Sequence, residues 1–178
     1  MTDLDSESAA LEQRALAAYE ADRYDEAIDL FESARAATDD PLKSAELANS
    51  SSVILLKQGQ NAEALEVVRG TAQVFQEAGD HGRQARATGN LAAALEACGE
   101  LHAAEAAYRE AADLFERTGD DEERMLTLNA LSQLQLRQRR PLDAAATLQA
   151  GVPTGRASGI RARLIQFLLR IPSRLLRY

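Results

Sequence analysis

The stretch LHAAEAAYREAADLFERTGD, residues 101–120, carries small residues, aromatic residues and charges at helical spacing and then stops at Gly119-Asp120. Gly is favoured just past the end of a helix, and Asp is favoured as the cap that begins the next one. The end of this stretch, LFERTGD at 114–120, matches VFQEAGD at 74–80 in residue type. The match indicates that residues 101–120 are one part of a repeated unit.

The motif ahead of each of these endings also recurs. KQGQNAEALEVV begins at Lys57, ACGELHAAEAAY at Ala97 and RQRRPLDAAATL at Arg137, so that each copy follows the last by 40 residues. An earlier copy, EADRYDEAIDLF, begins at Glu20, which is 37 residues before Lys57. A nearly fixed period of this size is typical of helix pairs that stack into a solenoid.

Caps and glycines divide the repeats into helices. Asp40-Pro41 offers a cap followed by Pro in the first turn, Gly79-Asp80 repeats the ending of the opening stretch, and Gly59 and Gly99 mark turns inside repeats. We therefore predict eight helices in the repeats, at 6–20, 24–37, 41–58, 61–78, 81–98, 101–118, 121–138 and 141–150.

Composition agrees with an all-helical chain. The 178 residues are 46% hydrophobic but 4% aromatic, with no Trp, so the core is built mainly from Ala and Leu. Such a core favours closely packed helices, and no alternating run of β-branched residues predicts a strand. The single cysteine, Cys98, excludes an internal disulfide. With a polar start and no long apolar run, the sequence predicts a cytoplasmic protein with a disordered N-terminus at 1–7.

The repeats resemble those of the tetratricopeptide family, in the variant with a period near 40 residues that is similar to kinesin light chain and to bacterial regulatory proteins. That family places a small residue midway along the first helix (helix A) of each pair and an Ala early in the second (helix B). Here the matching residues are Ala15, Ser52, Ala92 and Ser132, followed by Ala27, Ala64, Ala104 and Ala144. The resemblance covers about residues 8–151 and implies a right-handed α-solenoid of about four helix pairs.

Residues suited to catalysis or metal binding are sparse. His81 and His102 are 21 residues apart and have no Cys or His partner at ligand spacing, whereas zinc needs three or four converging ligands. Cys98 follows a helix beside a Gly turn, with no cationic neighbour to activate it, so we expect a partly buried structural thiol. No glycine-rich phosphate loop, Gly-x-Ser-x-Gly or HExxH motif occurs. We predict a protein that is not an enzyme and has no cofactor and no metal.

The resemblance also implies where a partner binds. In this family the residues around the small position of helix A line a concave groove that holds a peptide or helix. The matching residues here include Tyr19, Asn49, Val53, Leu56, Lys57, Arg86, Asn90, Asn129, Gln133 and Arg137. The asparagines could form a ladder that pairs with a peptide backbone, or each could bond to a neighbouring helix. The acidic body favours a basic or neutral ligand.

Charge is divided unevenly along the chain. Residues 1–143 hold 14 of the 20 Lys and Arg and all 28 Asp and Glu, whereas residues 144–178 hold six Arg and no acid. After a linker at 152–159, the segment 160–178 predicts a basic amphipathic helix. Its apolar and basic faces include Arg163, Leu164, Phe167, Leu168, Arg170, Ile171, Arg174 and Arg177.

Three interpretations of segment 160–178 remain open from the sequence. It could cap the apolar end of the solenoid, bind an anionic membrane surface, or enter an acidic groove of the same or another copy. Nucleic acid is disfavoured because the acidic body would repel a phosphate backbone. The sequence thus predicts a bacterial scaffold or adaptor for a protein partner. The alternatives are an assembly factor on the membrane periphery and a regulatory module of a signalling system.

Overall fold

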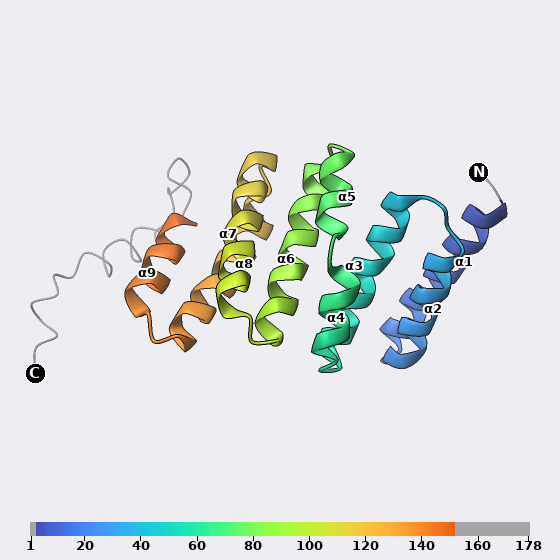
Figure 1. Cartoon of the computed structure of the whole chain (residues 1–178), viewed down its shortest axis with the longest axis horizontal. Coiled ribbons are helices and arrows are strands. Elements are labelled where there is room, and N and C mark those ends of the chain that lie inside the picture. The colour runs from blue at the N-terminus through green and yellow to red at the C-terminus, as the bar shows by residue number, and fades with distance from the viewer. Residues whose placement is uncertain (1–2, 152–178) are drawn as a thin grey trace, which may run out of the picture.

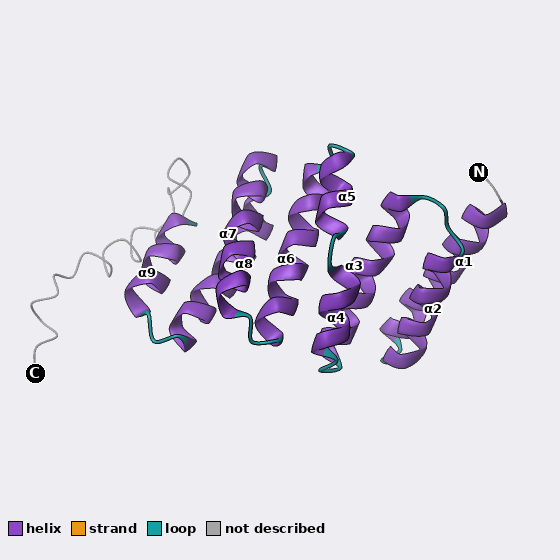
Figure 2. Ribbon diagram, viewed as in Figure 1, coloured by secondary structure: helices purple, strands orange, loops and turns teal. Residues whose placement is uncertain are grey.

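A computed structural model describes residues 3–151 of the chain, and within them the structure consists of helices and short loops (Figures 1 and 2). The helices stand side by side in a row, with the N-terminus at one end and α9 at the other. Their bounds are α1 (Asp3–Glu20), α2 (Tyr24–Ala36), α3 (Pro41–Lys57), α4 (Asn61–Val68), α5 (Thr71–Glu77), α6 (His81–Ala97), α7 (Leu101–Thr118), α8 (Asp121–Arg137) and α9 (Pro141–Ala150).

The row is an all-α solenoid of four helix pairs, as the sequence predicts. The A helices are α1, α3, α6 and α8, and their partners, the B helices, are α2, α4 with α5, α7 and α9. Each B helix packs on the A helix before it, and α2, α4, α5 and α7 also pack on the A helix that follows. Each helix therefore covers the apolar side of its neighbours along the chain, which no single pair could cover alone.

Small residues form the contacts inside each pair. Every predicted small position of the A and B helices is buried, with an exposed fraction between 0% and 2%. Larger side chains, including Phe31, Leu55, Phe75 and Leu131, fill the space between repeats. Small residues at these positions let helix axes approach to the short end of the usual 8–10 Å range.

Helix starts follow the predicted capping chemistry. The side chain of Asp40 accepts a hydrogen bond from the backbone N–H of Leu42 at 2.9 Å, and Asp80 does the same for Arg83 at 2.8 Å. Gly119 ends α7 in the left-handed conformation, with φ of 75°. These contacts satisfy backbone groups that a helix end leaves without partners.

The structure corrects two of the predicted boundaries. The helix predicted at 61–78 is broken into α4 and α5, because Gly70 adopts φ of 84° and the chain turns there. The first helix begins at Asp3, so residues 3–7, which were expected to be disordered, are helical. The predicted linker at 152–159 and the amphipathic helix at 160–178 lie outside the described residues. Within residues 3–151, none of the helices is both long and apolar enough to cross a membrane.

Candidate partner-binding face

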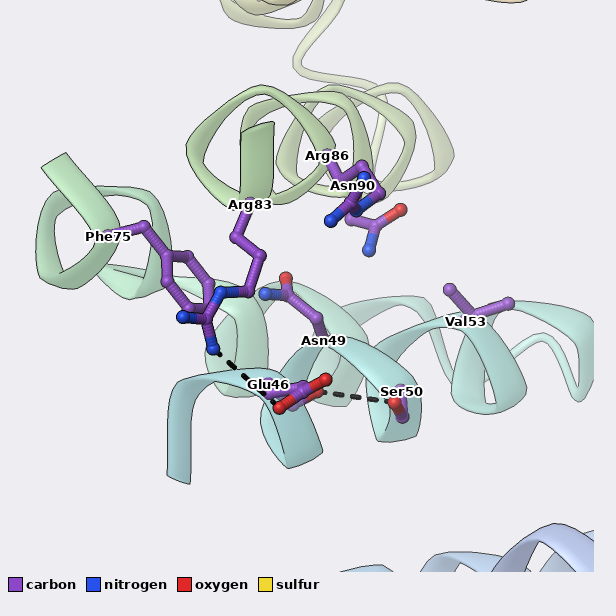
Figure 3. A pocket seen from close by; sticks show the side chains of 8 residues that line it. All are labelled: Glu46, Asn49, Ser50, Val53, Phe75, Arg83, Arg86 and Asn90. Atoms are coloured by element: carbon purple, nitrogen blue, oxygen red, sulfur yellow. Dashed lines mark hydrogen bonds and ion pairs between the residues drawn. The ribbon is translucent and has the colours of Figure 1, made fainter. Parts of the chain in front are cut away.

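Residues that the sequence assigned to the groove come together on the A helices. Between α3 and α6 they line an open depression of about 240 Å³ (Figure 3). Asn49 and Val53 come from α3 and Arg86 and Asn90 come from α6, and all four were predicted from the repeat pattern. The depression is completed by Glu46, Ser50, Phe75 and Arg83.

A second depression, of about 250 Å³, lies beside the first and shares Ser50 and Val53 with it. The predicted residue Tyr19 lines it together with Leu16, Phe31 and Ile54. Leu16 and Val53 are 48% and 44% exposed, so their apolar surfaces are open to a ligand at this depression. This depression can therefore accommodate an apolar side chain.

A third depression, of about 390 Å³, continues the row towards α8. The predicted residues Leu56 and Arg137 line it, along with Ala93, Glu96, Ala97, Leu101 and Tyr108. Asn129 and Gln133, the remaining predicted groove residues on α8, are exposed. We call the surface made by these three depressions the A-helix face.

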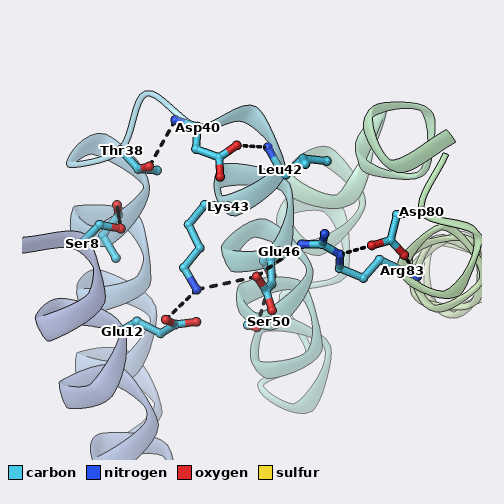
Figure 4. Close-up of polar contacts among 11 residues, drawn as sticks. Ser8, Glu12, Thr38, Asp40, Leu42, Lys43, Glu46, Ser50, Asp80 and Arg83 are labelled. Atoms are coloured by element: carbon cyan, nitrogen blue, oxygen red, sulfur yellow. Dashed lines mark hydrogen bonds and ion pairs between the residues drawn. The ribbon is translucent and has the colours of Figure 1, made fainter. Parts of the chain in front are cut away.

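A chain of ion pairs ties the first three A helices together (Figure 4). The Lys43 ammonium lies 2.6 Å from Glu12 and 3.6 Å from Glu46, and Glu46 lies 3.8 Å from the Arg83 guanidinium. Arg83 also pairs with Asp80 at 2.7 Å and stacks over the Phe75 ring at 5.1 Å. The backbone and side-chain hydrogen bonds from Arg83 lower the pKa of Asp80. The carboxylates at this end of the face are thus already neutralised.

Two of the predicted groove cations have partners within the chain. Lys57 lies over the rings of Tyr24 and Tyr19, with its Nζ 4.4 Å and 5.1 Å from their centroids. Its hydrogen bond with Tyr24 raises the pKa of Lys57, although desolvation opposes the shift. Arg137 pairs with Glu96, which also accepts a hydrogen bond from Tyr108 at 2.8 Å. Both cations therefore hold neighbouring repeats together.

The three asparagines differ in their surroundings. Asn49 is engaged inside the protein, because its Oδ1 accepts a hydrogen bond from Thr71 at 3.2 Å. Asn90 and Arg86, by contrast, form no hydrogen bond or ion pair with any residue in the range 3–151, and both line the first depression. Asn129 lies one repeat further on, on an exposed part of α8. Asn90 and Arg86 are the side chains of the first depression most available to a ligand.

Sequence reasoning missed four residues of the first depression. Glu46, Ser50 and Arg83 each lie one helical turn before a predicted residue, so extending the pattern by three positions would have found them. Phe75 could not be found in this way, because it comes from a B helix. It reaches the depression from α5, which packs against both α3 and α6 after the break at Gly70.

The isolated histidines and the cysteine are not gathered into a site. Among residues 3–151, no group of three or more His, Cys, Asp or Glu side chains is placed to hold a metal ion. His81 Nδ1 lies 3.3 Å from the amide oxygen of Gln84, and His102 is exposed. Cys98 was expected to be partly buried and is instead exposed, because it caps the end of α6, where the chain turns outward; its Sγ contacts the Asn61 carbonyl at 3.3 Å.

Comparison of structures identifies the fold. No family model and no curated protein matches this sequence. Its structure, however, superposes on the TPR-like repeats of a kinesin light chain of Podosopora anserina with a TM-score of 0.73 and 16% identity, over 94% of this chain and 90% of that one. The chain has a tetratricopeptide-repeat fold.

Two bacterial structures extend this comparison. MamA from Desulfovibrio magneticus RS-1 matches the tetratricopeptide solenoid with a TM-score of 0.64 and 20% identity, over 81% of this chain and 73% of that one. The Rap conjugation gene regulator of plasmid pLS20, solved with the Phr* peptide, matches with a TM-score of 0.65 and 15% identity, over 77% of this chain. The solenoid spans 39% of that regulator's length, so the likeness concerns the repeats alone.

Proposed function

We propose that this chain is a non-catalytic scaffold that binds a peptide segment of a protein partner along the A-helix face. The observation that carries the proposal is the unpaired state of Arg86 and Asn90 at the rim of an open depression. Side chains with unused hydrogen-bonding capacity at the edge of an apolar hollow are typical of a binding site. The Rap regulator, which has the same fold and was solved with a peptide, adds support by analogy.

The A-helix face favours a particular chemistry of ligand. An apolar side chain of the ligand would enter the depression of Leu16, Tyr19 and Val53, while Asn90 would pair with the peptide backbone. Glu12, Glu46 and Glu96 are each neutralised by a cation of the protein, whereas Arg86 is not paired. A neutral or acidic segment therefore suits this face better than the basic ligand that the overall charge suggested.

Selection from a random-peptide display library on the full chain would test this proposal. Selected peptides should bind Arg86→Ala and Asn90→Ala at least several-fold more weakly than the unaltered chain. Arg117→Ala and Gln149→Ala are matched controls, because both residues are exposed on B helices, and these variants should bind normally. Peptides that bind all four variants equally, or a library that yields no binder, would overturn the proposal.

The alternative functions find no support among residues 3–151. The role at the membrane periphery depends on residues 160–178, which lie outside the described part of the chain. The role in a signalling system has no structural feature of its own. The cytoplasmic location likewise remains an expectation from the sequence.

A further inference from the structure

A depression on the other side of the solenoid has no place in the proposed function. It measures about 560 Å³ and lies between α5, α6 and α7. The break at Gly70 places α5 at its edge, and Gly70 itself is part of the lining. The other lining residues are Ala72, Gln73, Gln76, Glu77, Gln84, Thr88, Leu91 and Glu110. We call this hollow the B-side depression.

The two carboxylates of the B-side depression favour a cationic ligand. The Glu110 side chain is exposed and forms no hydrogen bond or ion pair with residues 3–151. One carboxylate oxygen of Glu77 accepts a hydrogen bond from the Gln73 amide at 2.9 Å. Gln84, which also lines the depression, has its Oε1 3.3 Å from His81 Nδ1. A peptide segment that carries a basic side chain would pair with the two carboxylates, Glu77 and Glu110.

The charge around the B-side depression also favours a basic ligand. The B helices carry a series of exposed carboxylates, most of which form no ion pair with residues 3–151, whereas Glu46 and Glu96 of the A-helix face are both ion-paired. The exposed B-helix acids are Asp25, Glu26, Asp29, Glu32, Glu63, Glu66, Glu77, Glu110, Asp113, Glu116 and Asp143, of which Glu26, Glu116 and Asp143 pair with Arg23, Arg124 and Arg140. The B-helix surface therefore carries unpaired negative charge, which attracts a basic segment.

We propose that the arginine-rich segment 160–178 of the same chain docks in the B-side depression. This inference is independent of what binds the A-helix face. Residues 144–178 hold six Arg and no acid, which makes them the complement of the B-helix surface. The apolar residues between the arginines can cover Ala72 and Leu91, while an arginine pairs with Glu77 and Glu110.

The position of α9 makes this docking geometrically feasible. The chain leaves α9 at Gly151, which is buried, and the C-terminal end of α9 lies on the same edge of the row as α5 (Figure 1). The segment must pass over α7, whose Glu110 forms the near wall of the depression. Residues 152–159, extended at about 3.3–3.6 Å per residue, reach about 26–29 Å.

Photo-crosslinking of the full chain tests the docking. A benzophenone amino acid replaces Gln76, an exposed residue of the lining, and the crosslinked products are separated by size and mapped by mass spectrometry. We expect crosslinks to residues 160–178 in the monomer band. The double variant Glu77→Gln/Glu110→Gln should reduce their yield several-fold. The matched control Glu63→Gln/Glu66→Gln removes the same charge from exposed α4 positions and should leave the yield unchanged.

Each other outcome decides against the proposal. Crosslinks to the segment in a dimer band alone would mean that a second copy is the occupant. Crosslinks that disappear equally in both double variants would mean a diffuse attraction to the acidic surface with no defined site. An absence of crosslinks to residues 160–178 would mean that the segment lies elsewhere, on a membrane or at the end of the solenoid.

Discussion

The amide of Gln135 on α8 donates a hydrogen bond to the buried carboxylate of Glu105 on α7, with Nε2 and Oε1 3.2 Å apart. The amide oxygen of Gln135 accepts from Thr147 on α9 at 2.8 Å. Arg140, in the loop before α9, completes the group by donating to the second carboxylate oxygen at 2.7 Å. One polar network thus joins the last three helices of the solenoid, where the apolar core is thinnest and Ala144 is the buried residue of α9.

Replacing Glu105 should destabilise the last repeat. In Glu105→Ala the buried Gln135 amide loses its acceptor and Arg140 loses one of its three, and an orphaned buried donor costs about 1–3 kcal/mol. Glu105→Gln keeps an acceptor at the same place and should cost less. Urea unfolding measures both changes. Asp113→Ala is the control on the exposed side of α7 and should change the free energy of unfolding by less than about 0.5 kcal/mol. Equal effects at positions 105 and 113 would contradict the structural role of the network.

The same carboxylate makes stability depend on pH. Burial would raise the pKa of Glu105, but hydrogen bonds from Arg140 and Gln135 and the charges of Arg109 and Arg140 outweigh it, and the pKa lies below the ordinary 4.5. A lowered folded-state pKa means that its contribution is fully present above the unfolded value and is lost as pH falls through the folded value. Unfolding midpoints in urea between roughly pH 7 and pH 3 should therefore fall more steeply for the unaltered chain than for Glu105→Gln. Parallel pH profiles would show that protonation of Glu105 does not change the free energy of unfolding.

The sequence was sufficient for the repeats but not for the partners of individual side chains. The buried Ala and Ser positions follow from period and size alone, because the two helices of every repeat approach each other at the same place and need a small residue there. Lys57 and Arg137 share that period with the groove residues, yet each is held by a residue that only the folded chain brings near, Tyr24 and Glu96 respectively. The free state of Arg86 likewise depends on where neighbouring acids point. Separation of charge between the two sides became visible only once the helices were paired.

The break at Gly70 was missed because a glycine inside a helical pattern costs only about 1 kcal/mol and is often tolerated. Here φ of 84° shows that glycine is used for its conformational freedom. Gly70→Ala should therefore destabilise the chain by about 1 kcal/mol or more. Gly89→Ala is the opposite case: it lies within α6, and its added Cβ would meet Ala111 Cβ at an ordinary 4.0 Å, so it should stabilise by about 0.5–1 kcal/mol. The melting temperature should fall for Gly70→Ala and rise for Gly89→Ala. A shift of both temperatures in the same direction would contradict the interpretation.

Gly151 follows the last residue of α9, and its lack of a side chain lets this end of α9 pack closely against α8. A Cβ there would lie 2.6 Å from Met125 Sδ and 2.9 Å from Leu128 Cδ1, while the backbone φ of −76° is one that any residue adopts. The cost of Gly151→Ala is therefore steric, and overpacking of this kind typically costs about 1–3 kcal/mol. Because α9 is the last helix of the described row, we expect the loss to appear there first, as faster amide hydrogen exchange in α9 than in α3 or α6. Met125→Ala removes the closest atom, so the double variant Gly151→Ala/Met125→Ala should lose less stability than the sum of its two single variants. Additive effects would mean that Gly151 does not pack against Met125, and that something other than this contact fixes the end of the solenoid.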